Sequence, residues 1–104
     1  MAEPYLSELS ALAADWQRTD SEVGELDCRH FFSGAAAYRD GAIVATLTPV
    51  GLAFKVAAQV RDELLAGGKA IELRYFPAAP VKKDYVLFPS GKVESVEAVR
   101  LLLG

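Results

Sequence analysis

The sequence predicts an α+β domain, built as a two-layer α/β sandwich in which helices cover one face of an antiparallel sheet. Apolar residues recur with helical spacing near both ends and in the middle of the chain, and other short segments alternate apolar with polar residues. Tight turns join several of these alternating segments, which favours antiparallel pairing. The expected order is α-β(3)-α-β(2)-α. With 104 residues, 52% of them hydrophobic, the chain fits a single domain over 1–104.

The first element is predicted to be an amphipathic helix of about four turns. Its apolar residues recur at steps of three and four: Leu6, Leu9, Ala13 and Trp16. We expect Trp16 to anchor the core. A polar run follows and ends the helix, with Gly24 as a turn.

A three-stranded meander is predicted next. Asp40-Gly41 lies between two apolar segments and indicates a type I′ hairpin turn, because both central residues of that turn need a positive φ. Thr48-Pro49-Val50-Gly51 indicates a second turn. The strands are expected over about 30–38, 42–48 and 52–56.

The second half is predicted to hold two helices and two more strands. A helix in 57–66 ends at Gly67-Gly68, and "AIELRYF" at 70–76 alternates like a half-buried strand. The two prolines of "FPAAP" interrupt the sheet before a fifth strand, "DYVLF" at 84–88. Ser95 is expected to cap a last short helix.

The net charge of −3 conceals an asymmetry. Residues 1–27 carry −6 and residues 28–104 carry +3. Either an acidic, solvated helix is attached to an ordinary domain, or a mildly basic face is available to a partner; the excess is far smaller than in a typical nucleic-acid binder. One Cys cannot form an internal disulfide, and no apolar run approaches the length of a membrane helix. We expect a cytoplasmic protein with no membrane association.

The residues offer little for catalysis. Cys28 and His30 stand at i, i+2, on one side of a strand, but further metal ligands would have to be carboxylates, and a lone Cys is more often a small buried thiol. No phosphate-binding loop, dinucleotide fingerprint or nucleophile elbow occurs. We therefore predict no catalytic, metal or cofactor site. Gly34, within a strand, is expected to mark a bulge or a close backbone approach.

The segment "RHFFSGAAAYRDG", with "GLAFKV" and "LRYFPAAPVKKDYVLFP" after it, resembles the N-terminal domain of the TfoX/Sxy family of competence regulators. The matching residues are Arg29, Phe32, Gly34, Tyr38, Asp40, Gly41, Leu52, Lys55, Val56, Gly68, Tyr75, Tyr85 and Pro89. The resemblance implies a secretion-chaperone-like α-β(3)-α-β(2)-α sandwich, and makes Phe32, Gly34, Tyr38, Asp40 and Gly41 its structural motif. Ser33 departs from the family's usual Gly, and the C-terminal helical domain of longer members is missing, so a stand-alone N-terminal module is expected.

The leading functional hypothesis is a non-enzymatic regulatory or protein-interaction module. Its partner would be a protein not identified by the sequence, with the transcription machinery as one candidate and a second copy of the chain as another. The expected contact residues are Arg29, Lys55, Arg74, Lys82 and Lys83. Two alternatives stay open: direct nucleic-acid binding, which the acidic pI of about 5.1 disfavours, and a small-molecule site using Cys28, His30 and Tyr38.

Overall fold

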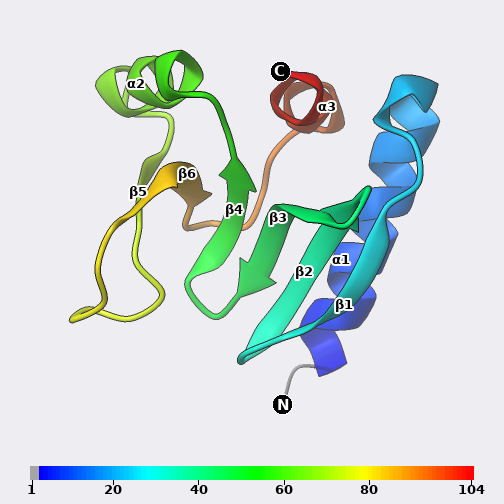
Figure 1. The fold of residues 1–104 in the computed structure, drawn as a ribbon, viewed down its shortest axis with the longest axis horizontal. Coiled ribbons are helices and arrows are strands. Elements are labelled where there is room, and N and C mark those ends of the chain that lie inside the picture. The colour runs from blue at the N-terminus through cyan, green and yellow to red at the C-terminus, as the bar shows by residue number, and fades with distance from the viewer. Residues whose placement is uncertain (1–2) are drawn as a thin grey trace.

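Six strands form one antiparallel sheet, and three α-helices pack on one of its faces (Figure 1). The computed structural model describes residues 3–104. The helices are α1 (Glu3–Thr19), α2 (Ala58–Ala66) and α3 (Ser95–Leu103), with a 3-10 helix η1 (Ser21–Val23) after α1. The strands are β1 (Asp27–Phe31), β2 (Gly34–Arg39), β3 (Ala42–Thr48), β4 (Gly51–Lys55), β5 (Ile71–Leu73) and β6 (Lys82–Phe88), in the spatial order β1-β2-β3-β4-β6-β5. The predicted α+β class and two-layer arrangement are confirmed.

The main core lies between the sheet and the helices. The buried face of α1 carries the predicted residues Leu9, Ala13 and Trp16. The Trp16 ring lies 5.5 Å from the ring of Phe54 on β4, centroid to centroid, so Trp16 does anchor the core. Burying side chains of this kind contributes roughly 1.5–3 kcal/mol each.

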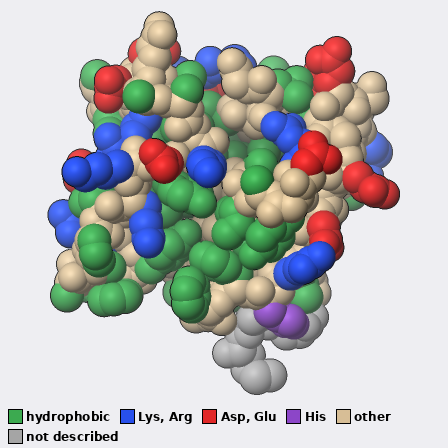
Figure 2. Space-filling model, viewed as in Figure 1, with side chains coloured by type: hydrophobic (Ala, Val, Ile, Leu, Met, Phe, Trp, Pro, Cys, Tyr) green, Lys and Arg blue, Asp and Glu red, His purple; other side chains and the backbone are tan. Residues whose placement is uncertain are grey.

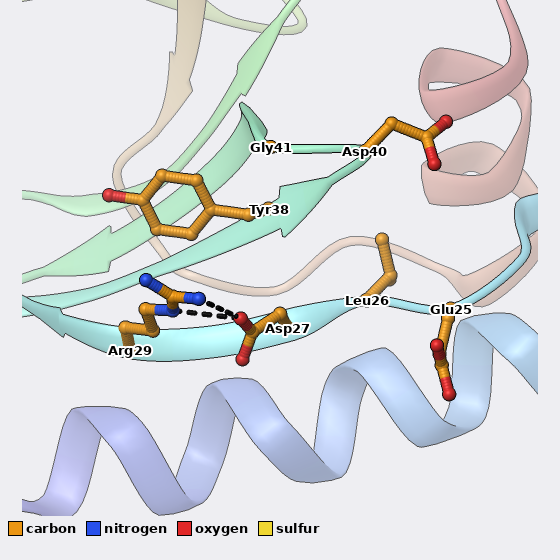
Figure 3. Close-up of a pocket in the computed structure, with 7 residues that line it drawn as sticks. All are labelled: Glu25, Leu26, Asp27, Arg29, Tyr38, Asp40 and Gly41. Atoms are coloured by element: carbon orange, nitrogen blue, oxygen red, sulfur yellow. Dashed lines mark hydrogen bonds and ion pairs between the residues drawn. The ribbon is translucent and has the colours of Figure 1, made fainter.

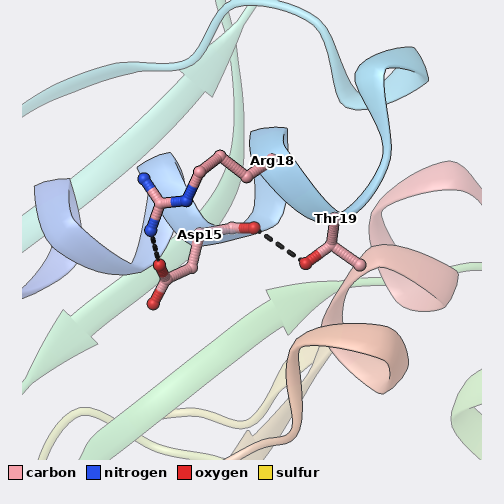
Figure 4. A network of polar contacts seen from close by, with 3 residues as sticks. All are labelled: Asp15, Arg18 and Thr19. Atoms are coloured by element: carbon pink, nitrogen blue, oxygen red, sulfur yellow. Dashed lines mark hydrogen bonds and ion pairs between the residues drawn. The ribbon is translucent and has the colours of Figure 1, made fainter.

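Helix α1 runs alongside β1 and β2 and ends in a local polar network (Figures 1 and 4). Thr19 Oγ1 donates a hydrogen bond of 2.8 Å to the carbonyl oxygen of Asp15, and Arg18 forms an ion pair with the Asp15 carboxylate. Both groups of the ion pair are solvent-accessible, so it contributes little to stability.

The first predicted strand, 30–38, is in fact two strands joined by a turn at Phe32-Ser33. The first unit of the sheet therefore holds four strands, β1 to β4, where three were expected. Phe32 adopts a positive φ of 51°, which lets the chain reverse between Phe31 and Gly34. Two-residue hairpin turns usually place glycine or asparagine at such a position, and the aromatic residue found there did not indicate a turn.

The other turns agree with their predictions. Asp40 and Gly41 have φ values of 53° and 83°, as a type I′ turn requires. Of the two explanations offered for Gly34, the close backbone approach is correct, because a Cβ there would lie 2.8 Å from the Cα of Thr48. The irregularity in register lies elsewhere, between Ala37 and Tyr38.

The second half keeps the predicted order with shifted boundaries. The fourth predicted strand ends at Leu73, so Tyr75 belongs to the loop that follows, and β6 begins at Lys82. The predicted cap of the last helix is wrong by one residue: Glu94 is the N-cap and Ser95 is the first helical residue. Within residues 3–104, no helix is both long and apolar enough to cross a membrane.

Candidate functional site

The face of the sheet that carries no helix is the candidate site. In the β1–β2 pair, Arg29 is opposite Ala36 and Phe31 is opposite Gly34, and residues directly opposite each other in a sheet share a face. The alternate residues Cys28 and Ala35 belong instead to the core beneath the helices. Figure 2 shows hydrophobic side chains gathered across the middle and lower part of one view, with Lys and Arg side chains around them.

Ile43 belongs to this face because of the bulge in β3. The register between β2 and β3 pairs Ala37 with Ala45 but Tyr38 with Ile43, which skips Val44. Ile43 therefore faces the same side of the sheet as Tyr38, while Val44 packs against the core. A bulge near one end of a sheet commonly redirects a side chain in this way.

One hollow beside β1 and β2 is polar (Figure 3). It has a volume of about 580 Å³ and is lined by Glu25, Leu26, Asp27, Arg29, Tyr38, Asp40 and Gly41. Arg29 forms an ion pair of 2.6 Å with Asp27, and its guanidinium carbon lies 5.6 Å from the centroid of the Tyr38 ring. The Asp27 carboxylate raises the pKa of Arg29 through this contact. A ligand of Arg29 would therefore compete with Asp27.

Another hollow, which we call the aromatic groove, lies between the β1–β2 turn and the loop that joins β5 to β6. Its volume is about 550 Å³. Its lining residues are Phe31, Phe32, Ser33, Ile43, Thr48, Tyr75, Phe76, Ala79, Pro80, Lys82 and Tyr85. This size and this predominance of aromatic side chains are typical of binding pockets.

Contacts between rings and with the sheet hold one wall of the groove in place. The Phe31 ring packs edge-on against Tyr75 at 5.9 Å and against Phe32 at 4.6 Å, between centroids. The Tyr75 hydroxyl lies 3.3 Å from the Thr46 hydroxyl, within hydrogen-bond distance, and Thr46 is almost fully buried. Tyr75 therefore ties the loop after β5 to the middle of the sheet.

The opposite wall is fixed by hydrogen bonds within the loop. Arg74 Nη1 donates to the carbonyl oxygen of Ala79 at 2.8 Å, and the Ala79 amide donates to the carbonyl oxygen of Phe76 at 2.9 Å. Ala79 itself is buried. The Phe76 side chain is nevertheless 58% exposed at the edge of the groove.

Phe32 has the most unusual environment in the groove. It is 85% exposed and has a positive φ. A bulky residue in the left-handed region is an outlier that costs roughly 1–3 kcal/mol. The packing of Phe32 in this structure offsets little of that cost, because its side chain contacts solvent over most of its surface.

Burial on this face changes the acidity of two tyrosines. Desolvation raises the pKa of Tyr75, and the hydrogen bond between the Tyr75 and Thr46 hydroxyls partly opposes the rise. Desolvation also raises the pKa of Tyr85, and Tyr75, Asp84 and Tyr38 act in the same direction. Both tyrosines therefore stay protonated, as neutral hydrogen-bonding groups, well above neutral pH.

The five basic residues predicted as a contact surface do not all line one hollow. Arg29 lines the polar hollow, Lys82 lines the aromatic groove, and Arg74 braces the loop. Lys55 is exposed and stands opposite Tyr85 in the β4–β6 pair, while Lys83 is exposed outside both hollows. Of the structural motif, Tyr38, Asp40 and Gly41 line the polar hollow, and Phe32 and Gly34 lie at the β1–β2 turn.

Cys28 and His30 lie on the other face of β1. Cys28 is half-buried, and desolvation raises its pKa, with Asp27 adding to the rise and a hydrogen bond with Ser10 opposing it. A raised pKa leaves less thiolate at neutral pH, which is unfavourable for a nucleophile. Tyr38 points to the opposite face, so the three residues of the predicted small-molecule site do not come together. Within residues 3–104, no cluster of three or more potential metal ligands is present.

Sequence reasoning missed most of the groove. Phe32 was expected only as part of a structural motif, and Ile43 and Phe76 were assigned no role. The available signal was "YFPAAP" at 75–80, in which two aromatic residues precede two prolines and so stand outside a regular ladder.

Comparison with models of known protein families, with curated proteins and with solved structures found no match. The likeness to the TfoX/Sxy N-terminal domain stays a prediction from the sequence. The functional argument therefore depends on the residues and geometry described above.

Proposed function

We propose that this chain is a non-enzymatic protein-interaction module that binds a segment of its partner in the aromatic groove. The main support is Phe32, which is 85% exposed at a strained position of a tight turn. Strained residues persist where the surrounding structure enforces them, and they concentrate at binding sites. A partner that covered Phe32 would recover apolar burial that the free chain lacks.

The exposed rings on either side of the groove support the same proposal. Phe76 is 58% exposed across the groove from the β1–β2 turn. Aromatic residues are enriched at the centres of protein interfaces, where they supply much of the binding energy. A surface that presents such residues around a concave groove suits a protein segment that inserts a side chain.

A regulatory role is the second part of the proposal. It follows from the resemblance of the segment at about 28–103 to the N-terminal domain of TfoX/Sxy regulators, and it makes the transcription machinery the candidate partner. This part depends on the sequence pattern alone, whereas the groove supports the interaction role.

Direct nucleic-acid binding has weaker support. Binding of a phosphate backbone draws on several cations close together. Here Arg29 is paired with Asp27, Arg74 is used within its own loop, and Lys82 lines the groove by itself. Two of the five basic residues are thus already engaged within the chain, which leaves Lys55 on β4 and Lys82 and Lys83 on β6 without an ion pair among the described residues.

Selection from a displayed random-peptide library tests the interaction role. We expect the wild-type chain to enrich peptides that a Phe32→Ser, Phe76→Ser double variant does not retain. Val96→Ser is the matched control, because Val96 is 72% exposed on α3 and does not line the groove. Both changes remove exposed apolar side chains and should leave the melting temperature nearly unchanged. Enrichment that is equal for the wild type and the double variant would overturn the proposal.

A further inference from the structure

We infer that the segment bound in the aromatic groove combines a large apolar side chain with a neighbouring carboxylate. This inference depends on the proposed function, and it specifies the chemistry of the partner at the same site. It combines the apolar lining of the groove with the single cation placed at its edge.

The groove requires an apolar anchor. Its lining includes five aromatic side chains, contributed by β1, the β1–β2 turn, the loop after β5, and β6: Phe31, Phe32, Tyr75, Phe76 and Tyr85. Aromatic pairs gain stabilisation from edge-on or offset contacts beyond their buried area. An aromatic or long aliphatic side chain of the partner would make such contacts, whereas a small or polar one would leave these rings exposed.

The groove also requires a negative charge beside that anchor. Within residues 3–104, Lys82 is the one charged side chain that lines the groove, and no ion pair to it is present. The Tyr85 hydroxyl makes no hydrogen bond to the described residues, and its raised pKa keeps it a donor. An ammonium and a phenol at one groove are complementary to a carboxylate, which accepts from both.

The walls of the groove are already in place in the free chain. The Tyr75 hydroxyl lies 3.3 Å from Thr46, and Arg74 donates to Ala79 at 2.8 Å across the loop. A fixed binding surface loses less conformational freedom on binding, so a short segment can bind without ordering the loop.

A peptide fits this arrangement better than a nucleic acid. Stacked bases would also use exposed rings, but single-strand binders combine those rings with a positively charged groove that follows the backbone. One lysine cannot follow a backbone. It can pair with one carboxylate while the groove holds one apolar anchor. Neighbouring residues of a peptide place two such side chains close together.

The test begins with the sequences that the wild-type chain enriches from the random library. We expect them to share an aromatic or large aliphatic residue with Asp or Glu within two positions. A representative peptide is then synthesised with two relatives, one with its acid changed to the amide and one with its anchor changed to Ala. Binding of each is measured by fluorescence anisotropy.

Lys82→Met supplies the decisive comparison, with Lys83→Met as its matched control. Lys83 is adjacent and exposed but does not line the groove. We expect Lys82→Met to weaken binding of the acidic peptide about fivefold, which is the effect of losing an exposed ion pair. Binding of the amide peptide should not change. Lys83→Met should leave both unchanged.

The possible failures are distinguishable. This inference would be overturned if the peptides that depend on the groove lacked an acidic residue. It would also be overturned if Lys82→Met reduced the affinity of the acid and amide peptides equally. Either result would leave the interaction role unchanged. Absence of groove-dependent enrichment would overturn both. An oligothymidylate that binds the wild type with a steep salt dependence, and competes with the peptides, would replace the peptide with a nucleic acid.

Discussion

The side chain of Arg39, at the end of β2, donates a hydrogen bond of 2.8 Å to the carbonyl oxygen of Leu102 in the last turn of α3. The two residues are 63 positions apart in the sequence. The same guanidinium lies 3.4 Å from the carbonyl oxygen of Val23 in η1. Arg39 thus connects a strand, the short helix after α1 and the C-terminal helix, and it supplies a donor to carbonyl groups that a helix end leaves unpaired.

Arg39→Met should therefore lower the free energy of unfolding by about 1.5–3 kcal/mol, the range for hydrogen bonds to charged groups. The substitution keeps an apolar stem and removes the donors, so the carbonyl group of Leu102 loses its partner. Urea unfolding followed by the fluorescence of Trp16, the single tryptophan, measures the change.

Arg18→Met is the control for that measurement. Arg18 is also paired, but with Asp15 in an exposed position on α1 (Figure 4). Exposed pairs contribute about 0–1 kcal/mol, so its loss should change stability much less. Equal changes in the free energy of unfolding would show that the hydrogen bond between Arg39 and Leu102 stabilises the fold no more than an exposed ion pair does.

Gly34→Ala should destabilise the chain by about 1–3 kcal/mol or more, as overpacking does. A Cβ at Gly34 would meet the carbonyl oxygen of Leu47 and lie 2.8 Å from the Cα of Thr48, and backbone atoms of a central strand cannot easily move. Gly41→Ala is the matched substitution, because a Cβ at Gly41 has nothing within 4 Å and only the positive φ opposes it. The melting temperature of Gly34→Ala should therefore be well below that of Gly41→Ala. The reverse order would contradict the close approach of Gly34 to the backbone of β3.

The hairpin turns show where sequence reasoning works. Asp40-Gly41 was predicted correctly because the need for a positive φ is local and Asp and Gly are residues that tolerate it. Phe32-Ser33 makes an equally tight turn, but an aromatic residue in the left-handed region gives no such signal. The segment at 30–38 was therefore predicted as one strand, and one strand of the sheet was missed.

The candidate site was harder to predict because it depends on distant residues. Ile43 faces the groove because the register shifts at Tyr38, and Tyr75 reaches it because the loop returns to Thr46. Neither the register shift nor the return of the loop can be recognised from the residues next to it in the sequence. Charge was visible in the sequence, so five basic residues were grouped, and among those five only Lys82 lines the groove.

Stability should fall at alkaline pH because of Tyr75 and Tyr85. Burial raises the pKa of both above the ordinary value near 10, so the unfolded chain loses these protons first as the pH rises. The contribution is complete below about pH 10 and decreases as the pH rises toward the folded-state pKa values. A Tyr75→Phe, Tyr85→Phe double variant should show a shallower decrease than the wild type. Urea unfolding between about pH 8 and pH 11 measures both slopes, and identical slopes would contradict the effect of burial.

Cys28 should react slowly with iodoacetamide in the folded chain. Desolvation and the nearby Asp27 raise its pKa, so the thiolate that reacts is scarce near neutral pH, and partial burial restricts access. The rate, followed by intact mass, should be lower than that of the same chain unfolded in urea at the same pH.

The pH profile of that reaction separates the two causes. Restricted access lowers the maximal rate, whereas a raised pKa moves the midpoint to higher pH. The hydrogen bond with Ser10 lowers the pKa of Cys28, so Ser10→Ala should move the midpoint further upward. Two results would contradict the contact between Cys28 on β1 and Ser10 on α1. One is a reaction midpoint that moves to lower pH in Ser10→Ala, and the other is the same midpoint in the folded and the unfolded chain. Such a result would also weaken the division of β1 between a core face and the helix-free face, because Cys28 and Arg29 mark the two sides.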